Sequence, residues 1–457
     1  MQNKIHKIPE KPVVIVGGGW SGLATACYLA EQNIPVTLIE SAKQLGGRAR
    51  KSTSRTQILD NGQHLMLGAY SEMLDLLRRI GIKEDDVFFR SQQHLKLLNA
   101  KYLHTILDLK LPAMAKPYNL LFGLLFSKGL RFKEKLIVLY RFDKLLKTPV
   151  PEDKDVSVTE WLKDADLPTN YILFLNALCL AAMNTSAGSA SAMSFQNVLN
   201  ETFNGEQGST DLLIPAVNLG SVLPLPASIY LAKKQAKVLN QTKATSLQLD
   251  NNTVTHIVTA DKTFAASAVV LATPAHITSQ LLKPAEDCNE LCHNLDQFRY
   301  ESITTVYLRY NDHCQIPEKI IGLTGSLSEW VFDRSVADQP GMIAVVISCS
   351  DSHREVENKD LCLTIRNELA VVFPHWPKPS ASWVIREKRA TFLCTPEANQ
   401  HRPGSATPLD NLFLSGDYLA TDKLFLPATL ETSIRNAKAS AEEVVNYLNR
   451  QNTDPTI

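Results

Sequence analysis

The fold is decided by residues 13–40, VVIVGGGWSGLATACYLAEQNIPVTLIE. The four apolar residues 13–16 predict a buried strand, and the Ala- and Leu-rich residues 21–32 predict a helix. Residues 36–39 predict a second buried strand. This order of elements predicts a βαβ unit of the kind that begins a doubly wound α/β fold.

Three glycines at the turn between the first strand and the helix give this unit a function. Gly17, Gly19 and Gly22 form the pattern G-x-G-x-x-G, which permits a tight turn and brings backbone close to a pyrophosphate. Glu40 lies 18 residues after Gly22, at the end of the second strand. A carboxylate there accepts hydrogen bonds from ribose hydroxyls and repels a 2′-phosphate. The glycine pattern alone is a weak signal, but together with Glu40 it predicts dinucleotide binding.

A second glycine-rich turn, Leu45-Gly46-Gly47-Arg48, follows Glu40 after a short loop. Its glycines allow close backbone approach, and Arg48 offers guanidinium donors to a phosphate. This segment resembles the second-strand signature of the amine oxidase/phytoene desaturase superfamily of FAD enzymes. Near the C-terminus, residues 412–417 (LFLSGD) and 426–431 (LPATLE) resemble the flavin segment of the same superfamily. The resemblance implies that the cofactor is FAD.

The superfamily resemblance also implies where FAD is held. It places Asp417 near the ribityl–pyrophosphate chain, the start of the last helix at the flavin ring, and the backbone of Val238 at the adenine. In the superfamily the last helix begins with Glu-Gly-Ala-Val-Arg-Ser-Gly, whereas residues 431–437 here read ETSIRNA. The residues expected to contact FAD are Gly17, Gly19, Trp20, Ser21, Gly22, Glu40, Gly46, Gly47, Arg48, Gly62, Gln63, His64, Val238, Gly416, Asp417, Thr429 and Glu431.

One group within the superfamily matches further. Residues 60–70, DNGQHLMLGAY, resemble a signature of the squalene-associated FAD-dependent desaturases, also called hydroxysqualene dehydroxylases. Further similarity lies in residues 178–185 (LCLAAMNT), 211–215 (DLLIP), 330–334 (WVFDR) and 390–392 (ATF). The resemblance implies reductive conversion of hydroxysqualene, a long isoprenoid alcohol, to squalene in bacterial hopanoid or related triterpene synthesis. Reduction of the flavin then needs an electron donor, which the sequence does not identify.

The same signature contains the candidate catalytic residues. His64 is a titratable side chain just beyond Gly62, and we consider it as the catalytic acid. In the alternatives, His64 and Gln63 hydrogen-bond the flavin or its supporting loop, or His64 is structural. Asp60 is either a catalytic carboxylate or, as we prefer, a turn-forming residue before Asn61.

Composition excludes several other classes of protein. The 457 residues contain 47 Lys plus Arg and 47 Asp plus Glu, so the overall balance gives no case for a nucleic-acid partner. The eight cysteines show no zinc-site spacing apart from Cys288 and Cys292 beside His293, so we expect no metal and reduced thiols. The longest apolar run, residues 120–126, is far shorter than the ~18 residues of a membrane-spanning helix.

One segment has a strong local charge. Residues 110–147 contain nine basic and two acidic residues, interleaved with Leu and Phe. A basic amphipathic segment of this kind favours the surface of an anionic membrane, and the alternative is an ordinary solvated helical cap. We expect a cytoplasmic protein bound peripherally to the inner face of the cytoplasmic membrane, because a C30 isoprenoid resides in the bilayer.

Strand and helix signals along the chain predict two interleaved domains. A helix signal at 71–80 and a mostly helical stretch at about 103–203 precede most of the strands. Strand-like alternation falls at residues 237–249, 253–260, 268–272, 302–310, 342–348, 382–388 and 411–414. The predicted fold is α/β, with a discontinuous Rossmann-type FAD-binding domain of residues 1–100, 226–280 and 401–457. An interleaved α+β substrate domain comprises residues 101–225 and 281–400, with membrane-facing helices at 110–147.

Two further functions remain open from the sequence. A desaturase of the same superfamily removes hydrogen from a carotenoid-like polyene with the flavin as acceptor. A non-catalytic flavin- or lipid-binding protein holds FAD that no isoprenoid alcohol reoxidises. Product analysis separates the three functions.

Overall fold

The fold is described from a computed structural model, which covers residues 8–54, 57–114, 117–420 and 424–453, with side chains to residue 451. Lys116 of the basic segment and the outermost residues of the predicted FAD domain, 1–7 and 454–457, lie outside the described residues.

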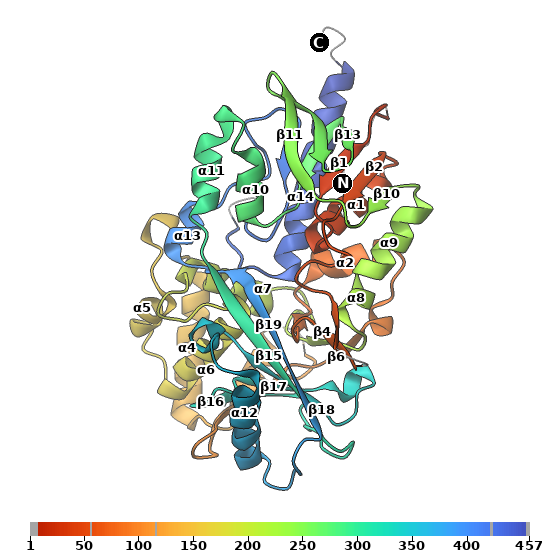
Figure 1. Cartoon of the computed structure of the whole chain (residues 1–457). Helices are drawn as coiled ribbons and strands as arrows, with labels where there is room; N and C mark the ends of the chain where they lie inside the picture. Colours follow the sequence, from red (N-terminus) through yellow and green to blue (C-terminus); the bar gives the residue numbers. More distant parts are fainter. Residues whose placement is uncertain (1–7, 55–56, 115–116, 421–423, 454–457) are drawn as a thin grey trace.

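The upper half of the molecule is built on a parallel sheet (Figure 1). Its strands are, in spatial order, β10 (Lys237–Leu239), β2 (Val36–Ile39), β1 (Val13–Val16), β14 (Ala268–Leu271) and β20 (Leu412–Leu414). Strands β1, β2 and β14 are buried along their whole length, as expected for parallel strands covered on both faces. One face packs against helices α1 (Trp20–Glu31), α9 (Pro224–Lys233) and α14 (Leu430–Thr453). The predicted βαβ unit and fold class are confirmed.

The other face of the parallel sheet is covered by a small antiparallel sheet and two helices. They are β11 (Ala244–Asp250), β12 (Thr253–Thr259), β13 (Thr263–Ala265), α10 (Ala275–Leu282) and α11 (Asn289–Asp296). The single strand predicted over 237–249 is wrong: the chain leaves β10 after Leu239 and re-forms as β11 in this second sheet. The break follows from the turn at residues 240–243, where Thr242 donates its backbone N–H to the carbonyl of Glu40.

The lower half contains a mixed sheet (Figure 1). Its strands are, in spatial order, β19 (Ala381–Phe392), β15 (Tyr300–Arg309), β18 (Met342–Ile347), β17 (Trp330–Asp333), β16 (Ile320–Thr324), β7 (His94–Asn99) and β8 (Thr105–Lys110). Helix α12 (Asn358–Val372) covers one face. The other face is covered by α3 (Tyr118–Phe126), α4 (Phe132–Lys147), α5 (Val158–Lys163), α6 (Thr169–Met183) and α7 (Ala192–Phe203).

Several short elements complete the fold. They are β3 (Lys51–Ser54), β4 (Gln57–Asp60), β5 (Met66–Leu67), α2 (Ser71–Arg79), β6 (Phe88–Ser91), β9 (Leu212–Pro215), α8 (Leu219–Val222) and α13 (Pro396–Gln400). Of these, α2 and α8 pack in the core of the upper half. Strand β9 lies between β5 and β6, so the DLLIP segment pairs directly with the end of the signature at 60–70.

Two sequence predictions about this region need correction. Residues 105–110 form strand β8 rather than part of a helical stretch, because Ile106, Leu107 and Leu109 are buried against the mixed sheet. Strand β7, which the prediction assigned to the FAD domain, pairs with β8 and β16 in the mixed sheet of the substrate half. Strand β7 therefore belongs to the sheet of the substrate half, and the domain bounds stay predictions.

Candidate active site

A cavity of about 760 Å³ begins at the two glycine loops and continues between the mixed sheet and helices α6 and α7. At its upper end the first loop leaves β1 with Gly17 at φ +112°, a backbone conformation that disfavours side chains. A Cβ at Gly17 would lie only 2.5 Å from the carbonyl oxygen of Ala272. Helix α1 then begins at Trp20 without an acidic side chain in its first turn, which leaves its positive end for a phosphate.

Glu40 binds the first glycine loop, and the second loop is bonded to the first nearby. The Glu40 carboxylate accepts hydrogen bonds from the backbone N–H of Gly18 at 2.6 Å and of Ala42 at 2.6 Å. The second loop is tied to the first by the N–H of Gly46, which donates to the carbonyl of Gly18 at 2.8 Å. Glu40 also lines the cavity, as the ribose-binding role predicted for it requires.

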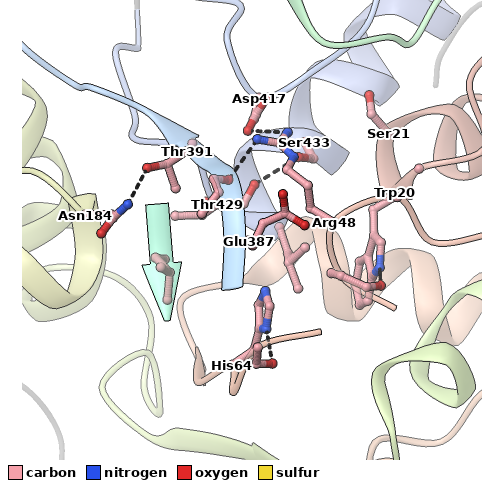
Figure 2. A pocket seen from close by; sticks show the side chains of 18 of the residues that line it. Trp20, Ser21, Arg48, His64, Asn184, Glu387, Thr391, Asp417, Thr429 and Ser433 are labelled. Carbon is pink, nitrogen blue, oxygen red and sulfur yellow. Dashed lines mark hydrogen bonds and ion pairs between the residues drawn. The ribbon is translucent and has the colours of Figure 1, made fainter. Parts of the chain in front are cut away.

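Arg48 and Asp417 are in contact at the cavity wall, although 369 residues separate them in sequence (Figure 2). The Arg48 guanidinium lies 2.7 Å from the Asp417 carboxylate and also donates to the carbonyl of Ala390 at 3.0 Å. Arg48, predicted as a phosphate donor, is thus held by Asp417 in the structure. The two side chains bring the second glycine loop and the C-terminal flavin segment to one place.

The last helix, α14, presents its N-terminus to the same cavity. Thr429 stands before the first residue of α14, and its side chain accepts the N–H of Thr432 at 3.1 Å. Thr429, Leu430 and Ser433 line the cavity. The positive end of α14 therefore faces the space where the resemblance places the flavin ring.

Most of the predicted cofactor residues line this cavity, and three do not. The three are Gly22, Val238 and Glu431, which are not among the described residues that line the cavity. Gly22 packs α1 on the first loop, since a Cβ there would lie 1.9 Å from the carbonyl oxygen of Gly17. Residues 242–244, just after β10, line the cavity in place of Val238. Glu431 points to the start of α2, where it accepts the backbone N–H groups of Glu72 and Met73 at 3.1 and 2.9 Å.

The signature at 60–70 forms the middle of the cavity wall. Asp60 is buried and forms an ion pair with Arg334 at 3.0 Å, the two side chains being 1% and 3% exposed. Arg334 also donates to the side chain of Gln63. Two family-like segments, DNGQH and WVFDR, are therefore joined by one arginine. Asp60 is held in this structural pair, so it is not placed as a catalytic carboxylate.

His64 lines the cavity with one ring nitrogen already occupied (Figure 2). Nδ1 lies 3.0 Å from the carbonyl oxygen of Gly62, and since a carbonyl only accepts, Nδ1 carries the proton. Burial lowers the pKa of His64 below its usual value, so the ring is neutral at pH 7. Nε2 is then an acceptor. This geometry suits His64 to receive a hydrogen bond rather than to supply a proton.

Sequence reasoning missed the polar residues that β19 contributes. Glu387 and Thr391 line the cavity, and Thr391 accepts a hydrogen bond from Asn184 at the end of α6 at 3.0 Å (Figure 2). Glu387 accepts the side-chain N–H of Asn61 at 2.7 Å. Thr391 lies in the ATF segment and Asn184 in the LCLAAMNT segment, so the contact joins two of the segments that carry the family resemblance. Glu387 lies outside every motif.

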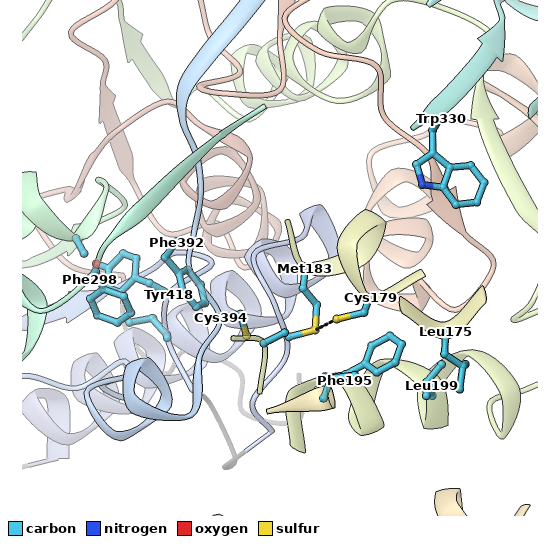
Figure 3. Packing of buried hydrophobic residues seen from close by; sticks show 14 of the residues in the cluster. Leu175, Cys179, Met183, Phe195, Leu199, Phe298, Trp330, Phe392, Cys394 and Tyr418 are labelled. Carbon is cyan, nitrogen blue, oxygen red and sulfur yellow. Dashed lines mark hydrogen bonds between the residues drawn. The ribbon is translucent and has the colours of Figure 1, made fainter. Parts of the chain in front are cut away.

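The lower part of the cavity is mainly apolar. Buried side chains of α6 and α7, among them Leu175, Phe195 and Leu199, pack beside one another there (Figure 3). The residues that line this chamber are Leu65, Gln93, Leu95, Leu178, Ala181, Ala182, Phe195, Val198, Leu199, Thr202, Phe203, Leu212, Ile303, Ile320, Trp330, Phe332, Val346 and Ser348. A chamber of this composition suits a long apolar ligand with few polar groups.

Other features of the described residues concern metals and membranes. No group of three or more His, Cys, Asp or Glu side chains in the described ranges is arranged to hold a metal ion. The eight cysteines are free thiols. Within the same ranges, no helix has the length and apolar character needed to cross a membrane.

The residues of the upper cavity fit a dinucleotide with a flavin. Two glycine loops leave room beside backbone N–H groups, Glu40 stands where a ribose is expected, and two helix N-termini face the space between them. Such a cofactor site opening on a buried apolar chamber defines a flavin-dependent oxidoreductase. The chain belongs to the flavin containing amine oxidoreductase family, which matches residues 20–445. Its cofactor is FAD.

Individual relatives extend over nearly the whole chain. The chain is 26% identical over 459 residues to a hydroxysqualene dehydroxylase of Sinorhizobium fredii, covering 96% of this chain and 99% of the relative. It is 23% identical over 466 residues to a 15-cis-phytoene desaturase of an Oncidium hybrid cultivar, covering 96% of this chain and 78% of that one.

Solved structures show the same fold. An oxidoreductase from Methanosarcina mazei superposes with a TM-score of 0.74 at 14% identity, covering 94% of this chain and 100% of that chain. Cyclohexylamine oxidase from Brevibacterium oxydans superposes with a TM-score of 0.70 at 14% identity, covering 97% and 100%.

Proposed function

We propose that this chain catalyses the FAD-dependent reductive dehydroxylation of hydroxysqualene to squalene, in bacterial hopanoid or related triterpene synthesis. The observation that carries the proposal is the continuity of one cavity from the glycine loops to the apolar chamber between the mixed sheet and α7. The near full-length similarity to relatives named hydroxysqualene dehydroxylase supports the choice of substrate.

The chain's residues have three tasks in this reaction. Glu40, the glycine loops and the start of α14 hold the cofactor, and FAD, once reduced, supplies a hydride. The apolar chamber binds the isoprenoid chain and excludes the water that would trap an allylic cation. The substrate hydroxyl is allylic, so its departure as water leaves a delocalised cation, and a group in the cavity must supply the proton.

A desaturase of a carotenoid-like polyene is the second candidate. The similarity to 15-cis-phytoene desaturases, at 22–23% identity over 96% of this chain, favours it. The same chamber would hold a polyene, but the electrons would flow toward the flavin instead of from it. A non-catalytic flavin- or lipid-binding protein is the third function weighed, and it predicts no turnover in either direction.

The test is anaerobic incubation of chemically reduced holoprotein with hydroxysqualene, followed by product identification. The expected product is squalene, formed as the flavin absorbance of the oxidised state returns. Oxidised holoprotein is incubated with phytoene in parallel. New double bonds there, with no squalene in the first reaction, would favour the desaturase. Absence of both products would favour the binding protein.

We also propose that the outer surface of α3 and α4 docks on an anionic membrane. Phe132, Leu136 and Tyr140 lie one turn apart on α4 and are all exposed. Phe126, at the end of α3, is 81% exposed. Large apolar side chains rarely stand in water in such a group without a partner surface. Exposed basic side chains at Lys128, Arg131, Lys133 and Lys144 accompany them.

The inner surface of α4 is close to the substrate chamber. Phe142 of α4 packs edge-on against Phe203 of α7, with 5.5 Å between ring centroids, and Phe203 lines the cavity. A membrane docked on the outer face would therefore lie one helix away from the apolar chamber. Figure 1 shows α4 on the left flank of the lower half. This placement supports direct entry of an isoprenoid from the bilayer.

A further inference from the structure

The proposed dehydroxylation leaves its proton donor unassigned, and the cavity offers few acidic groups. Among the described residues that line it, three carry carboxyl groups: Glu40, Glu387 and Asp417. Glu40 accepts hydrogen bonds from two backbone N–H groups at the upper end of the cavity. Asp417 is paired with the Arg48 guanidinium. Both carboxyl groups are engaged by protein donors, so neither is free to contact a substrate hydroxyl.

Glu387 differs from the other two. In the described part of the chain it forms no ion pair, and one of its oxygens accepts the amide N–H of Asn61 at 2.7 Å. Its other oxygen has only a long contact, 3.4 Å, with the backbone N–H of Arg389. That oxygen is the carboxyl position in the cavity with the weakest protein partner.

The location of Glu387 joins the cofactor site to the substrate chamber. On β19 it pairs with Ile303 of β15, and both residues line the cavity. Its partner Asn61 precedes Gly62 in the flavin-side loop, and Asn61 also donates to the carbonyl of Arg48 at 3.0 Å. Figure 2 shows Glu387 between Arg48 and His64. A group at this junction reaches the part of a long substrate that lies nearest the flavin.

Three neighbouring titratable groups do not compete for the role, the first being the Arg48 guanidinium, which faces Glu387 but is paired with Asp417 and stays protonated. The proton of His64 is on Nδ1 and bonded to the Gly62 carbonyl, which leaves Nε2 as an acceptor. Tyr70 also lines the cavity, but burial raises the pKa of its hydroxyl far above the usual value, which weakens it as an acid.

We propose that Glu387 is the catalytic residue that protonates the leaving hydroxyl of the substrate, an inference that rests on the proposed dehydroxylation. The Glu387 carboxyl proton joins the hydroxyl oxygen as the carbon–oxygen bond breaks, and water leaves with the electron pair of that bond. Reduced FAD, when bound, would supply the hydride that the allylic carbon needs, so that two electrons pass to the substrate. Glu387 regains its proton from solvent.

The test compares leaving groups in single-turnover reactions of chemically reduced holoprotein. E387Q preserves the side-chain shape and can still accept the hydrogen bond from Asn61, but it cannot donate an acidic proton. Its rate with hydroxysqualene is expected to fall by about 10²–10⁴-fold. With the acetate ester of hydroxysqualene, which leaves as acetate and needs no proton, E387Q is expected to react within about tenfold of the wild type.

A second arm uses chemical rescue and does not depend on the ester being accepted. E387A removes the carboxyl group and makes room for a small acid, so added formic acid buffer should restore part of the lost rate. FAD content and the visible flavin spectrum are measured for every variant. Both should match the wild type, because Glu387 acts on the substrate rather than on the cofactor.

The matched control is E329Q. Glu329 is a carboxyl close to this wall: it accepts the N–H of Ser348 at 2.8 Å, and burial raises its pKa to about 7. Glu329 is not among the described residues that line the cavity, whereas Ser348 is. E329Q should therefore keep its rate with hydroxysqualene.

Each result has one reading. Loss in E387Q with rescue in either arm supports Glu387 as the acid. The assignment is overturned if E387Q keeps the wild-type rate, or if its loss is rescued in neither arm. It is also overturned if E387Q loses FAD, or if E329Q instead shows a loss that the ester rescues. If the wild type itself makes no squalene, the proposed dehydroxylation is wrong, and the role of Glu387 is wrong with it.

Discussion

At the scale of single residues, cofactor binding depends on Glu40 more than on any other side chain of the first loops. Its carboxylate accepts backbone N–H groups from both sides of the turn and lines the cavity. Arg48 is shared between Asp417 and the carbonyl of Ala390, so its charge is already balanced. The adenosine end of FAD is therefore expected to be most sensitive to Glu40.

We predict that Glu40→Ala weakens FAD binding. Loss of a hydrogen bond to a charged group costs about 1.5–3 kcal/mol, which corresponds to roughly a 10–150-fold higher Kd. The apoprotein is titrated with FAD, and binding is monitored through the quenching of flavin fluorescence. Glu31→Ala is the control, because Glu31 lies at the far end of α1 and pairs with Arg79. An unchanged Kd in Glu40→Ala would show that the ribose is held by other groups.

Where a local motif carries the chemistry, the residues predicted from sequence lie together in the structure, and their roles in binding the cofactor stay predictions. Gly17, Gly19, Glu40, Gly46 and Gly47 all line the cavity, because the βαβ unit fixes their places within a short stretch. Prediction from sequence failed where the partner comes from far along the chain. Glu387 meets Asn61 across 326 residues, and nothing in the sequence around Glu387 marks it. The family resemblance assigned Glu431 to the cofactor. In the structure its carboxylate instead accepts two backbone N–H groups from the first turn of α2.

At the scale of elements, helix α4 has one buried face and one exposed apolar face. Val138, Phe142 and Leu146 recur at helical spacing and are buried, whereas Phe132, Leu136 and Tyr140 recur at the same spacing and are exposed. The sequence predicted this amphipathic segment as a whole. It did not predict that Lys135 is used internally, donating to the carbonyls of Leu125 and Ser127 at the end of α3.

We predict that two sets of substitutions separate the charge and apolar contributions to membrane docking. Replacing Lys128, Arg131, Lys133 and Lys144 with Gln should lower co-sedimentation with phosphatidylglycerol vesicles at low salt, by ~1 kcal/mol per residue near the surface. Binding of the wild type should fall as salt rises, because the Debye length shrinks from ~10 Å at 0.1 M to ~3 Å at 1 M. Replacing Phe126, Phe132 and Tyr140 with Ser should lower binding at both salt concentrations, because apolar insertion is lost.

The chain provides a matched control for the apolar set. Leu225 and Ile229 on α9 are 55% and 49% exposed, and they lie on the FAD-binding half. Replacing both with Ser should leave vesicle binding unchanged. All variants should retain FAD. If neither the basic nor the apolar set changes the bound fraction, α3 and α4 form a cap on the chamber and substrate enters elsewhere.

At the scale of the whole molecule, the cofactor site is assembled from segments spread along nearly all of the chain. The described cavity wall on the cofactor side takes residues from 16–21, 39–50, 61–70, 242–244, 272–274, 416–417 and 428–433. The βαβ unit and the interleaving of two halves were predictable, because glycine spacing and strand patterns recur at both ends and in the middle. The exact strand membership was not, because one of the neighbours of β7 in the sheet, β16, comes from a segment far along the chain.

We predict that FAD stabilises the whole protein against unfolding, because no single segment holds the cofactor and unfolding of any of them releases it. A ligand that binds only the folded state adds about 2.7 kcal/mol to the free energy of unfolding at a hundred times its Kd. Thermal unfolding of the apoprotein should therefore show one transition that moves to higher temperature as FAD is added. FMN, which lacks the adenosine that Glu40 is expected to hold, should give a smaller shift at equal concentration, and Glu40→Ala should reduce the difference between the two. Two transitions, of which only one responds to FAD, would instead show that the interleaved halves unfold separately and that the cavity between them is not a cooperative unit.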